Sequence, residues 1–237
     1  MTKVKKPALL LLPNLLGEHK HPEIFLPASV GQAVLSVDGL IAESEYGGRR
    51  YLKRFHGENP VHLIPLAVFN KDTREGDIDF LLQPIKQGER WGYVSDAGLP
   101  CIADPGSKLV ARARQLGIVV QAFVGPSSIL MALMLSGLPG QNFTFHGYLA
   151  GEGRDFNKHI KQIESQAEQV TQIFMEAPFR NDKLLKQLLS VLNPETKLCV
   201  AWDLTLPTQG IVSQPAALWH KSPLPNLNDK PAIFLIG

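Results

Sequence analysis

The chain has 237 residues, of which 44% are hydrophobic and 19% are charged. This composition is typical of a globular protein and excludes a disordered chain. The length suits one large α/β domain or two domains of roughly 100 residues each. A net charge of +2 permits a nucleic-acid partner but does not by itself argue for one.

The cysteines and the apolar runs indicate a reduced, non-membrane environment. Cys101 and Cys199 are far apart and lack the spacing of metal ligands, so we expect free thiols. No apolar run approaches the ~18–20 residues of a membrane span. We therefore expect a cytoplasmic protein with no membrane partner and no metal site.

Strands and helices alternate along the first half of the chain. Apolar runs predict strands at residues 9–12, 38–43, 62–66, 91–94 and 118–123. Apolar residues at helical spacing predict helices at 27–35, 73–88 and 108–116. Alternation this regular favours a mostly parallel sheet covered by helices.

The same alternation resumes in the second half. Strands are predicted at 143–149, 171–176, 197–201 and 232–236, and helices at 129–136, 155–169 and 181–192. We expect two domains, an N-terminal α/β domain at 1–123 and a C-terminal α/β domain at 124–237.

The most informative stretch is residues 94–110, VSDAGLPCIADPGSKLV. A predicted strand ends in a loop of small residues, and a second turn at Asp104–Ser107 opens onto a helix. Ligands of open α/β sheets bind at the carboxyl ends of strands, in loops of this kind. The alternative is an ordinary connection between a strand and a helix.

Residues 44–56 form the most basic segment of the chain. Arg49, Arg50 and Lys53 are interleaved with the aromatic residues Tyr51 and Phe55. Basic and aromatic residues mixed in this way can follow a nucleic-acid backbone and stack on bases. The alternative is an amphipathic helix with a solvated basic face.

Several reaction classes are disfavoured by the motifs that the sequence lacks. The first strand is followed by a single glycine, Gly17, so a dinucleotide fingerprint is absent, and there is no P-loop lysine. No pattern of an activated serine or cysteine nucleophile occurs either. From the residues alone, the chain is an α/β protein with a small-molecule cleft.

Three motifs resemble the tetrapyrrole methylase superfamily: VSDAGLPCIADPG at 94–106, VGPSS at 124–128 and SGLPGQNFTFHGYLA at 136–150. Within it, the chain is most similar to the branch of the ribosomal small-subunit RNA cytidine 2′-O-methyltransferases. LLLLPNLLG at the start, FMEAPFR and AWDLT in the second half and PAIFLIG at the end extend the resemblance over most of the chain.

The resemblance implies two α/β domains with mostly parallel or mixed sheets, a ligand cleft between them, S-adenosylmethionine as methyl donor, and a homodimer. It implies methyl transfer to an acceptor such as small-subunit ribosomal RNA, at a ribose hydroxyl. The residues that match the donor site of the family are Ala97, Gly98, Leu99, Ile102, Ala103, Ser127, Ser128, Met175, Leu204 and Ala232. The candidate catalytic carboxylates are Asp96, Glu43 and Asp104, and the candidate RNA-binding residues are Arg49, Arg50 and Lys53.

Two loops depart from the pattern of the ribosomal RNA branch. That branch carries P-T-P-I-G-N in the first loop, where this chain has Pro13-Asn14-Leu15-Leu16-Gly17-Glu18. It carries A-E-D-T-R after the second strand, where this chain has Ala42-Glu43-Ser44-Glu45-Tyr46. The glutamate is kept, and the acid and the arginine are either lost or displaced to Arg49 and Arg50. These loops face the acceptor side in the family, which makes the chain a divergent paralogue.

Three other functions remain open at this point. The chain could bind the methyl donor without catalysing transfer, because its acceptor loops are altered. It could methylate a tetrapyrrole or another small molecule, although the glycine-rich first loop of those enzymes is missing. A dinucleotide oxidoreductase is disfavoured by the absent fingerprint.

Overall fold

The computed structural model describes residues 6–57, 59–149, 153–221 and 223–237. The chain forms two compact units, Met1–Pro126 (unit 1) and Ser127–Gly237 (unit 2). The sequence-based boundary falls after residue 123, and the boundary in the structure falls after Pro126.

Unit 1 contains a five-stranded, wholly parallel sheet in the order β3-β2-β4-β1-β5. Its strands are β1 (Ala8–Leu11), β2 (Gly39–Ala42), β3 (Leu66–Val68), β4 (Arg90–Val94) and β5 (Val120–Ala122). The ends of neighbouring strands are in register, since Ala42, the last residue of β2, pairs with Val94, the last residue of β4.

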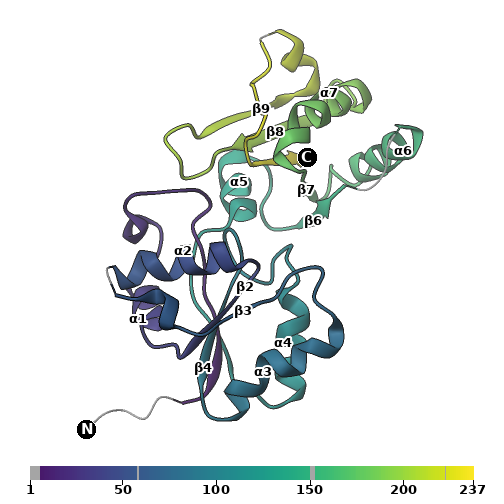
Figure 1. The fold of residues 1–237 in the computed structure, drawn as a ribbon. Coiled ribbons are helices and arrows are strands. Elements are labelled where there is room, and N and C mark those ends of the chain that lie inside the picture. The colour runs from purple at the N-terminus through teal and green to yellow at the C-terminus, as the bar shows by residue number, and fades with distance from the viewer. Residues whose placement is uncertain (1–5, 58, 150–152, 222) are drawn as a thin grey trace. The chain divides into compact units, whose positions relative to one another are not determined.

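Four helices cover the two faces of this sheet (Figure 1). They are α1 (Ala28–Val34), α2 (Glu45–His56), α3 (Ile78–Lys86) and α4 (Gly106–Gln115). Residues of α1 and α2 share one hydrophobic cluster with one face of the sheet. Residues of α3 and α4 share a second cluster with the opposite face.

The leucines of β1 explain this double covering. Successive residues of a strand point to opposite faces. Accordingly Leu10 packs with the helices α1 and α2, and Leu9 packs with α3 and α4. Because both faces are buried, the strand is a continuous apolar run without alternating polar residues.

Unit 2 contains a mixed five-stranded sheet in the order β6-β7-β10-β8-β9. Its strands are β6 (Phe143–Tyr148), β7 (Thr171–Met175), β8 (Lys197–Trp202), β9 (Gly210–Pro215) and β10 (Ala232–Ile236). The pair β6–β7 is parallel, and the pairs β7–β10, β10–β8 and β8–β9 are antiparallel.

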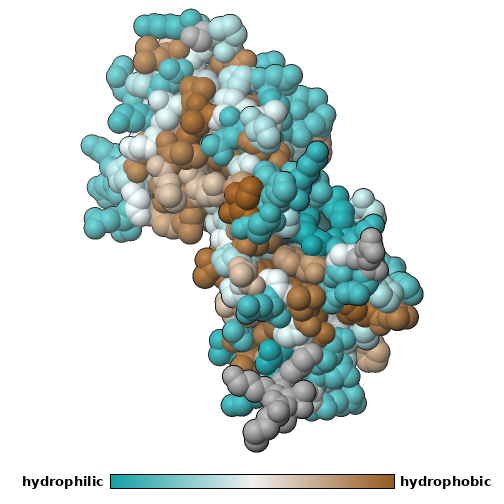
Figure 2. Space-filling view, turned by 90° about the vertical axis from the view of Figure 1, so that its left-hand side faces the viewer, coloured by the Kyte–Doolittle hydropathy of each residue, from teal (hydrophilic) through white to brown (hydrophobic). Residues whose placement is uncertain are grey.

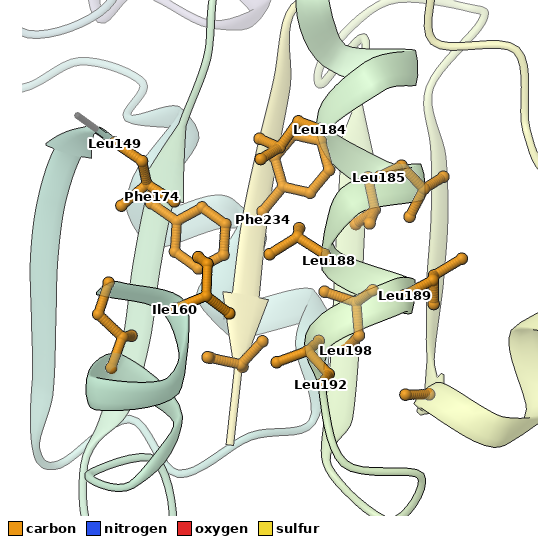
Figure 3. Packing of buried hydrophobic residues seen from close by; sticks show 14 of the residues in the cluster. Leu149, Ile160, Phe174, Leu184, Leu185, Leu188, Leu189, Leu192, Leu198 and Phe234 are labelled. Carbon is orange, nitrogen blue, oxygen red and sulfur yellow. The ribbon is translucent and has the colours of Figure 1, made fainter. Parts of the chain in front are cut away.

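The helices of unit 2 are α5 (Ser128–Ser136), α6 (Gly153–Glu164) and α7 (Asn181–Val191). Leu184 and Leu188 of α7 point towards Phe174 and Phe234, as Figure 3 shows. The rings of these two phenylalanines are stacked, with centroids 6.0 Å apart. Helix α5 contacts β8, β9 and β10.

The fold class is confirmed, and two elements differ from the sequence-based expectation. The strand expected at 62–66 is wrong: Val61–Leu63 form a 3-10 turn, and β3 begins at Leu66. Pro65 has no N–H to donate to the ladder, although its carbonyl accepts from the N–H of Leu40 at 2.9 Å, and the strand starts after it. Strand β9 was not predicted at all.

On the surface, hydrophilic side chains predominate in the view of Figure 2, and apolar side chains gather in separate patches. Within the ranges that the structure describes, no helix has the length and apolar character needed to cross a bilayer.

Candidate functional site

The site lies where the connections of the parallel sheet diverge. Strand β2 leads into α2 on one face of the sheet, and its neighbour β4 leads into α4 on the other face. Adjacent strands whose connections leave in opposite directions open a crevice at their carboxyl ends, and ligands of α/β sheets bind there. The residues at this point are Glu43 and Ser44 after β2, and Ser95 and Asp96 after β4.

A pocket of about 210 Å³ occupies this position in unit 1. Its base is the last residues of the two strands, Ala42 and Val94, and one wall is the first turns of α2. The full lining is Asn14, Ala42, Ser44, Tyr46, Gly47, Arg50, Tyr51, Arg54, Val94, Ser95 and Asp96.

Asn14 ties the first loop to the loop after β4. Its side-chain Nδ2 donates to the carbonyl oxygens of Ser95 and Asp96, both at 3.0 Å. Its backbone N–H donates to the carbonyl of Gly98 at 2.8 Å. Its Oδ1 accepts from Arg54 Nη1 at 2.9 Å, so one asparagine joins both loops to helix α2.

Glu43 and Asp96 form an acidic pair at the edge of the pocket. The backbone N–H of Asp96 donates to Glu43 Oε1 at 2.9 Å. Burial raises the pKa of Glu43, and the negative charges of Asp96 and Asp104 raise it further, against the opposing effect of that hydrogen bond. The carboxylate of Asp96 is exposed and accepts no hydrogen bond from the described residues.

Asp104 shapes the loop in which it lies. Its Oδ1 accepts from the hydroxyl of Tyr93 at 2.9 Å and from the backbone N–H of Gly106 at 2.6 Å. Its Oδ2 accepts from the N–H of Cys101 at 2.7 Å. Burial, together with the charge of Asp104, raises the pKa of Tyr93, so the phenol remains a donor to this carboxylate.

The predicted donor loop, residues 97–103, has a constrained backbone. Gly98, Cys101 and Ala103 all have positive φ, at 67°, 70° and 62°. A side chain at Gly98 would approach Leu16 Cδ2 to 3.2 Å and the carbonyl of Pro126 to 3.5 Å. The loop still presents apolar surface, because Ala97 and Ala103 are exposed and the side chain of Ile102 is 50% exposed. Leu99 is half-buried.

The basic residues of α2 have different surroundings. The Nη1 of Arg49 donates to the carbonyls of Val61 and Ile64, at 2.8 and 2.6 Å, which fixes the segment before β3. Lys53 is exposed, and its ammonium has no ion-pair partner in the part of the chain that the structure describes. Arg50 lines the pocket and pairs with Glu18.

In unit 2, three predicted donor residues lie at the same end of the three adjacent strands β7, β10 and β8. Met175 ends β7 and pairs with Ile233, the second residue of β10. Ala232 begins β10 and pairs with Trp202, the last residue of β8, and Leu204 follows that strand. Met175 is half-buried, whereas Leu204 and Ala232 are both 6% exposed.

Ser127 and Ser128 begin helix α5. The hydroxyl oxygen of Ser127 accepts from the N–H of Leu130 at 3.4 Å and caps the helix, and Ser128 is the first helical residue. Both residues are half-buried. Residues of this type cap helices because their oxygens accept from the unpaired N–H groups of the first turn.

Sequence reasoning missed Asn14, Tyr51 and Arg54 as parts of the site. Tyr51 is buried and its hydroxyl donates to the carbonyl of Pro13 at 3.0 Å. The contacts of Asn14 with Ser95 and Asp96 span 81 and 82 residues, and no local pattern reveals such a contact. Among the described residues, no group of three His, Cys, Asp or Glu side chains could hold a metal ion.

Comparison of the sequence with known proteins gives several related methyltransferases. A protein of Xylella fastidiosa named ribosomal RNA small subunit methyltransferase I is 36% identical over 173 residues, 72% of this chain and 60% of that protein. The Vibrio cholerae protein of the same name is 35% identical over 161 residues, 64% of this chain and 55% of that protein. The chain thus spans less than two thirds of the length of these relatives.

Two solved structures share the fold. The methyltransferase CobJ superposes with a TM-score of 0.65 at 16% identity, over 97% of this chain and 93% of that one. The uroporphyrin-III C-methyltransferase of Thermus thermophilus gives a TM-score of 0.55 at 17% identity, over 98% of this chain and 92% of that one. The sequence model of the family described as Tetrapyrrole (Corrin/Porphyrin) Methylases matches residues 40–218, most of both units. The chain belongs to the tetrapyrrole methylase family.

Proposed function

We propose that this protein is an S-adenosylmethionine-dependent methyltransferase that acts on small-subunit ribosomal RNA, at a ribose 2′-hydroxyl. One observation carries the proposal: the loop with the sequence VSDAGLPCIADPG follows β4 at the divergence of β2 and β4, beside an acidic pair and a pocket. Relatives named as ribosomal RNA methyltransferases support the choice of acceptor.

The residues present in unit 1 fit this donor. A sulfonium is a cation, and the carboxylate of Asp104 gives residues 97–107 a negative charge. Residues 95–107 contain no lysine or arginine that would oppose it. The exposed apolar surface of Ala97, Ile102 and Ala103 suits the uncharged parts of an adenosyl group. When bound, S-adenosylmethionine supplies a methyl group activated by the sulfonium.

The protein mainly has to align the acceptor and accept a proton. Asp96 is the residue we assign as base, because its exposed carboxylate lines the pocket and is free of hydrogen bonds with the described residues. Glu43 is a positioning residue that acts through Asp96, because its carboxylate accepts a hydrogen bond from the backbone N–H of Asp96. Asp104 is engaged within its loop and supports the loop's shape.

Two basic side chains of α2 are available to the RNA phosphates. Lys53 is exposed and free of an ion pair with the described residues. Arg50 lines the pocket, and its partner Glu18 is itself 66% exposed, so the guanidinium can exchange that carboxylate for a phosphate. Arg49 is held by backbone carbonyls and is left out of the assignment.

The proposal is tested by incubating the purified protein with methyl-tritiated S-adenosylmethionine and unmethylated small ribosomal subunits. We expect label in the RNA, in dinucleotides that resist alkali because the 2′-oxygen is blocked. Asp96→Asn should lower the rate at least ~100-fold, in the range that a general base contributes, with the affinity for the donor unchanged.

Donor binding without transfer to any RNA acceptor would overturn the proposal and indicate a binding protein. Label in a tetrapyrrole and not in RNA would redirect it to a small-molecule acceptor. Arg112→Gln is a matched control, because Arg112 pairs with the exposed Asp79 on the α3–α4 side of unit 1, and it should leave the rate unchanged.

A further inference from the structure

An exposed tyrosine forms part of the pocket wall. Tyr46 lies in the first turn of α2, lines the pocket and is 75% exposed. One turn later, the guanidinium carbon of Arg50 lies 5.6 Å from the centroid of the Tyr46 ring. Arg50 also forms an ion pair with Glu18.

Apart from the carboxylate of Asp96, which is free of hydrogen bonds with the described residues, the polar side chains that line the pocket around this ring make hydrogen bonds within the protein. Ser44 Oγ accepts from the N–H of Gly47, and Ser95 Oγ donates to the carbonyl of Ala97. The side-chain amide of Asn14 donates to the loop after β4, and its oxygen accepts from Arg54. A ligand in this pocket therefore finds a flat ring and a cation more readily than a set of unpaired donors and acceptors.

The size of the pocket further limits the kind of ligand that it can hold. Its volume of about 210 Å³ is below the ~300–1,000 Å³ of pockets that enclose drug-sized molecules. A single planar ring with its attached sugar matches such a space better than a tetrapyrrole macrocycle does. Base stacking on an aromatic ring is tolerant of base identity, because every base has a π-face, and arginine adds a cation–π contribution.

We propose that Tyr46, with Arg50 beside it, is a stacking platform for one nucleobase of the acceptor strand. The inference rests on the proposed function, because it takes the acceptor to be RNA. The platform contacts the face of the base and forms no hydrogen bond with its edge. Position 46 is thereby a specificity-determining residue that selects acceptors carrying a planar ring, with little preference among the bases.

The test measures binding alone, without methyl transfer. Fluorescein-labelled octamers of cytidine and of uridine are compared with an octamer of the same length that carries abasic sugars. Stacking contributes ~1–3 kcal/mol per base, so the wild type should bind the cytidine octamer roughly 5- to 150-fold more tightly than the abasic one. The uridine octamer should bind within about threefold of the cytidine octamer, as sequence-tolerant stacking implies.

Tyr46→Ala should remove most of this difference, and Tyr46→Phe should retain it. Phe80→Ala is the matched control, because Phe80 is an aromatic that is 80% exposed on α3, on the opposite face of the sheet. Wild-type affinities that are equal for cytidine and abasic octamers, or a difference that persists in Tyr46→Ala, would overturn the inference. Methyl transfer to RNA that continues alongside either result would leave the proposed function standing, whereas ring-dependent binding without any transfer would count against the function alone.

Discussion

At the scale of single residues, neighbouring cations of α2 have opposite roles. Arg49 is a structural residue, because its guanidinium donates hydrogen bonds to two backbone carbonyls. Lys53 is exposed, and its charge is solvated. Arg49→Met should destabilise the protein by about 1–3 kcal/mol, because the carbonyls of Val61 and Ile64 lose a charged donor. The lower part of that range is expected, since the Arg49 side chain is 28% exposed. Urea unfolding gives the measurement.

Lys53→Met provides the contrasting variant. It should leave stability within about 0.5 kcal/mol and lower the slope of log K against log salt for single-stranded RNA by about 0.7. If Arg49→Met changed the salt slope and Lys53→Met did not, the assignment of the two residues would be reversed.

Two glutamates, Glu43 and Glu164, have pKa values shifted in opposite directions and predict opposite pH dependences. The pKa of Glu43 is raised above its ordinary value of 4.5, mainly by burial. Its protonated form is therefore favoured in the fold, and stability is lost as the pH rises above 4.5 through the folded pKa. Glu43→Gln cannot ionise and can still accept the N–H of Asp96, so its melting temperature relative to wild type should rise between pH 4 and pH 7.

Glu164 is the matched comparison. Burial opposes its ionisation, but hydrogen bonds from Lys161, Thr196 and the N–H of Asn193 hold its pKa below 4.5. Its contribution is present above pH 4.5 and is lost as the pH falls through the folded pKa. Glu164→Gln should therefore lose stability relative to wild type as the pH rises from 3 to 5. Parallel curves for the two variants would contradict both assignments.

At the scale of elements, the loops after β1, β4 and β5 pack against one another. A Cβ at Gly125 would lie 2.1 Å from Pro13 Cβ. Gly125→Ala should therefore destabilise unit 1 by ~1–3 kcal/mol, as overpacking does. It should also weaken donor binding, because it displaces the first loop, whose Asn14 holds the loop after β4. Gly76→Ala is the control, because nothing lies within 4 Å of a Cβ there. Calorimetry and titration with S-adenosylhomocysteine would measure the two effects, and equal behaviour of the two variants would refute the packing argument.

The elements that the sequence predicted are those with a strong local signal. Strand β4 and helix α4 frame the loop at residues 95–105 as expected, because a buried apolar run and helical spacing are each visible within about ten residues. Strand β9 was missed because only Ile211 and Val212 are apolar in it and because it is an edge strand that pairs with β8 alone. Tertiary context decides such strands.

In the candidate site, too, some features could be predicted from local sequence and others could not. The loop between β4 and α4 could be predicted because its glycines and prolines stand in one continuous motif. The roles of Arg49 and Asp104 could not, because a guanidinium bound to carbonyls and one bound to phosphate have the same sequence pattern. For Asp104, the deciding contact is the hydroxyl of Tyr93, eleven residues away on the preceding strand.

At the scale of the whole molecule, each unit has its own sheet and its own hydrophobic core. The net charge of +2 supplies little long-range attraction for a polyanion. Under the proposed function, RNA is therefore recognised by a few local contacts. With Arg50 and Lys53 as the phosphate ligands, we expect a salt slope of about −1.4 for single-stranded RNA, from ~0.7 per phosphate. A slope steeper than about −4 would show that the RNA contacts a larger basic surface than Arg50 and Lys53 provide.

Ligand-dependent unfolding of the whole chain tests the donor site independently of any acceptor. A ligand that binds only the folded state at ~100 times its dissociation constant adds about 2.7 kcal/mol. For a chain of this size that raises the melting temperature by roughly 5–10 °C. S-adenosylmethionine and S-adenosylhomocysteine should both produce the shift, and NAD should not.

Asp96→Asn should keep the full shift, because this residue is assigned to the acceptor's proton and its backbone contact with Glu43 is unaffected. Gly98→Val should lose the shift, because a valine at φ +67° is strained and its side chain would meet Leu16 and the carbonyl of Pro126. The opposite result is a melting-temperature shift that survives in Gly98→Val and disappears in Asp96→Asn. It would indicate that the donor binds beside the Asp96 carboxylate and not in the loop, which would contradict the proposed separation of donor loop and acceptor pocket.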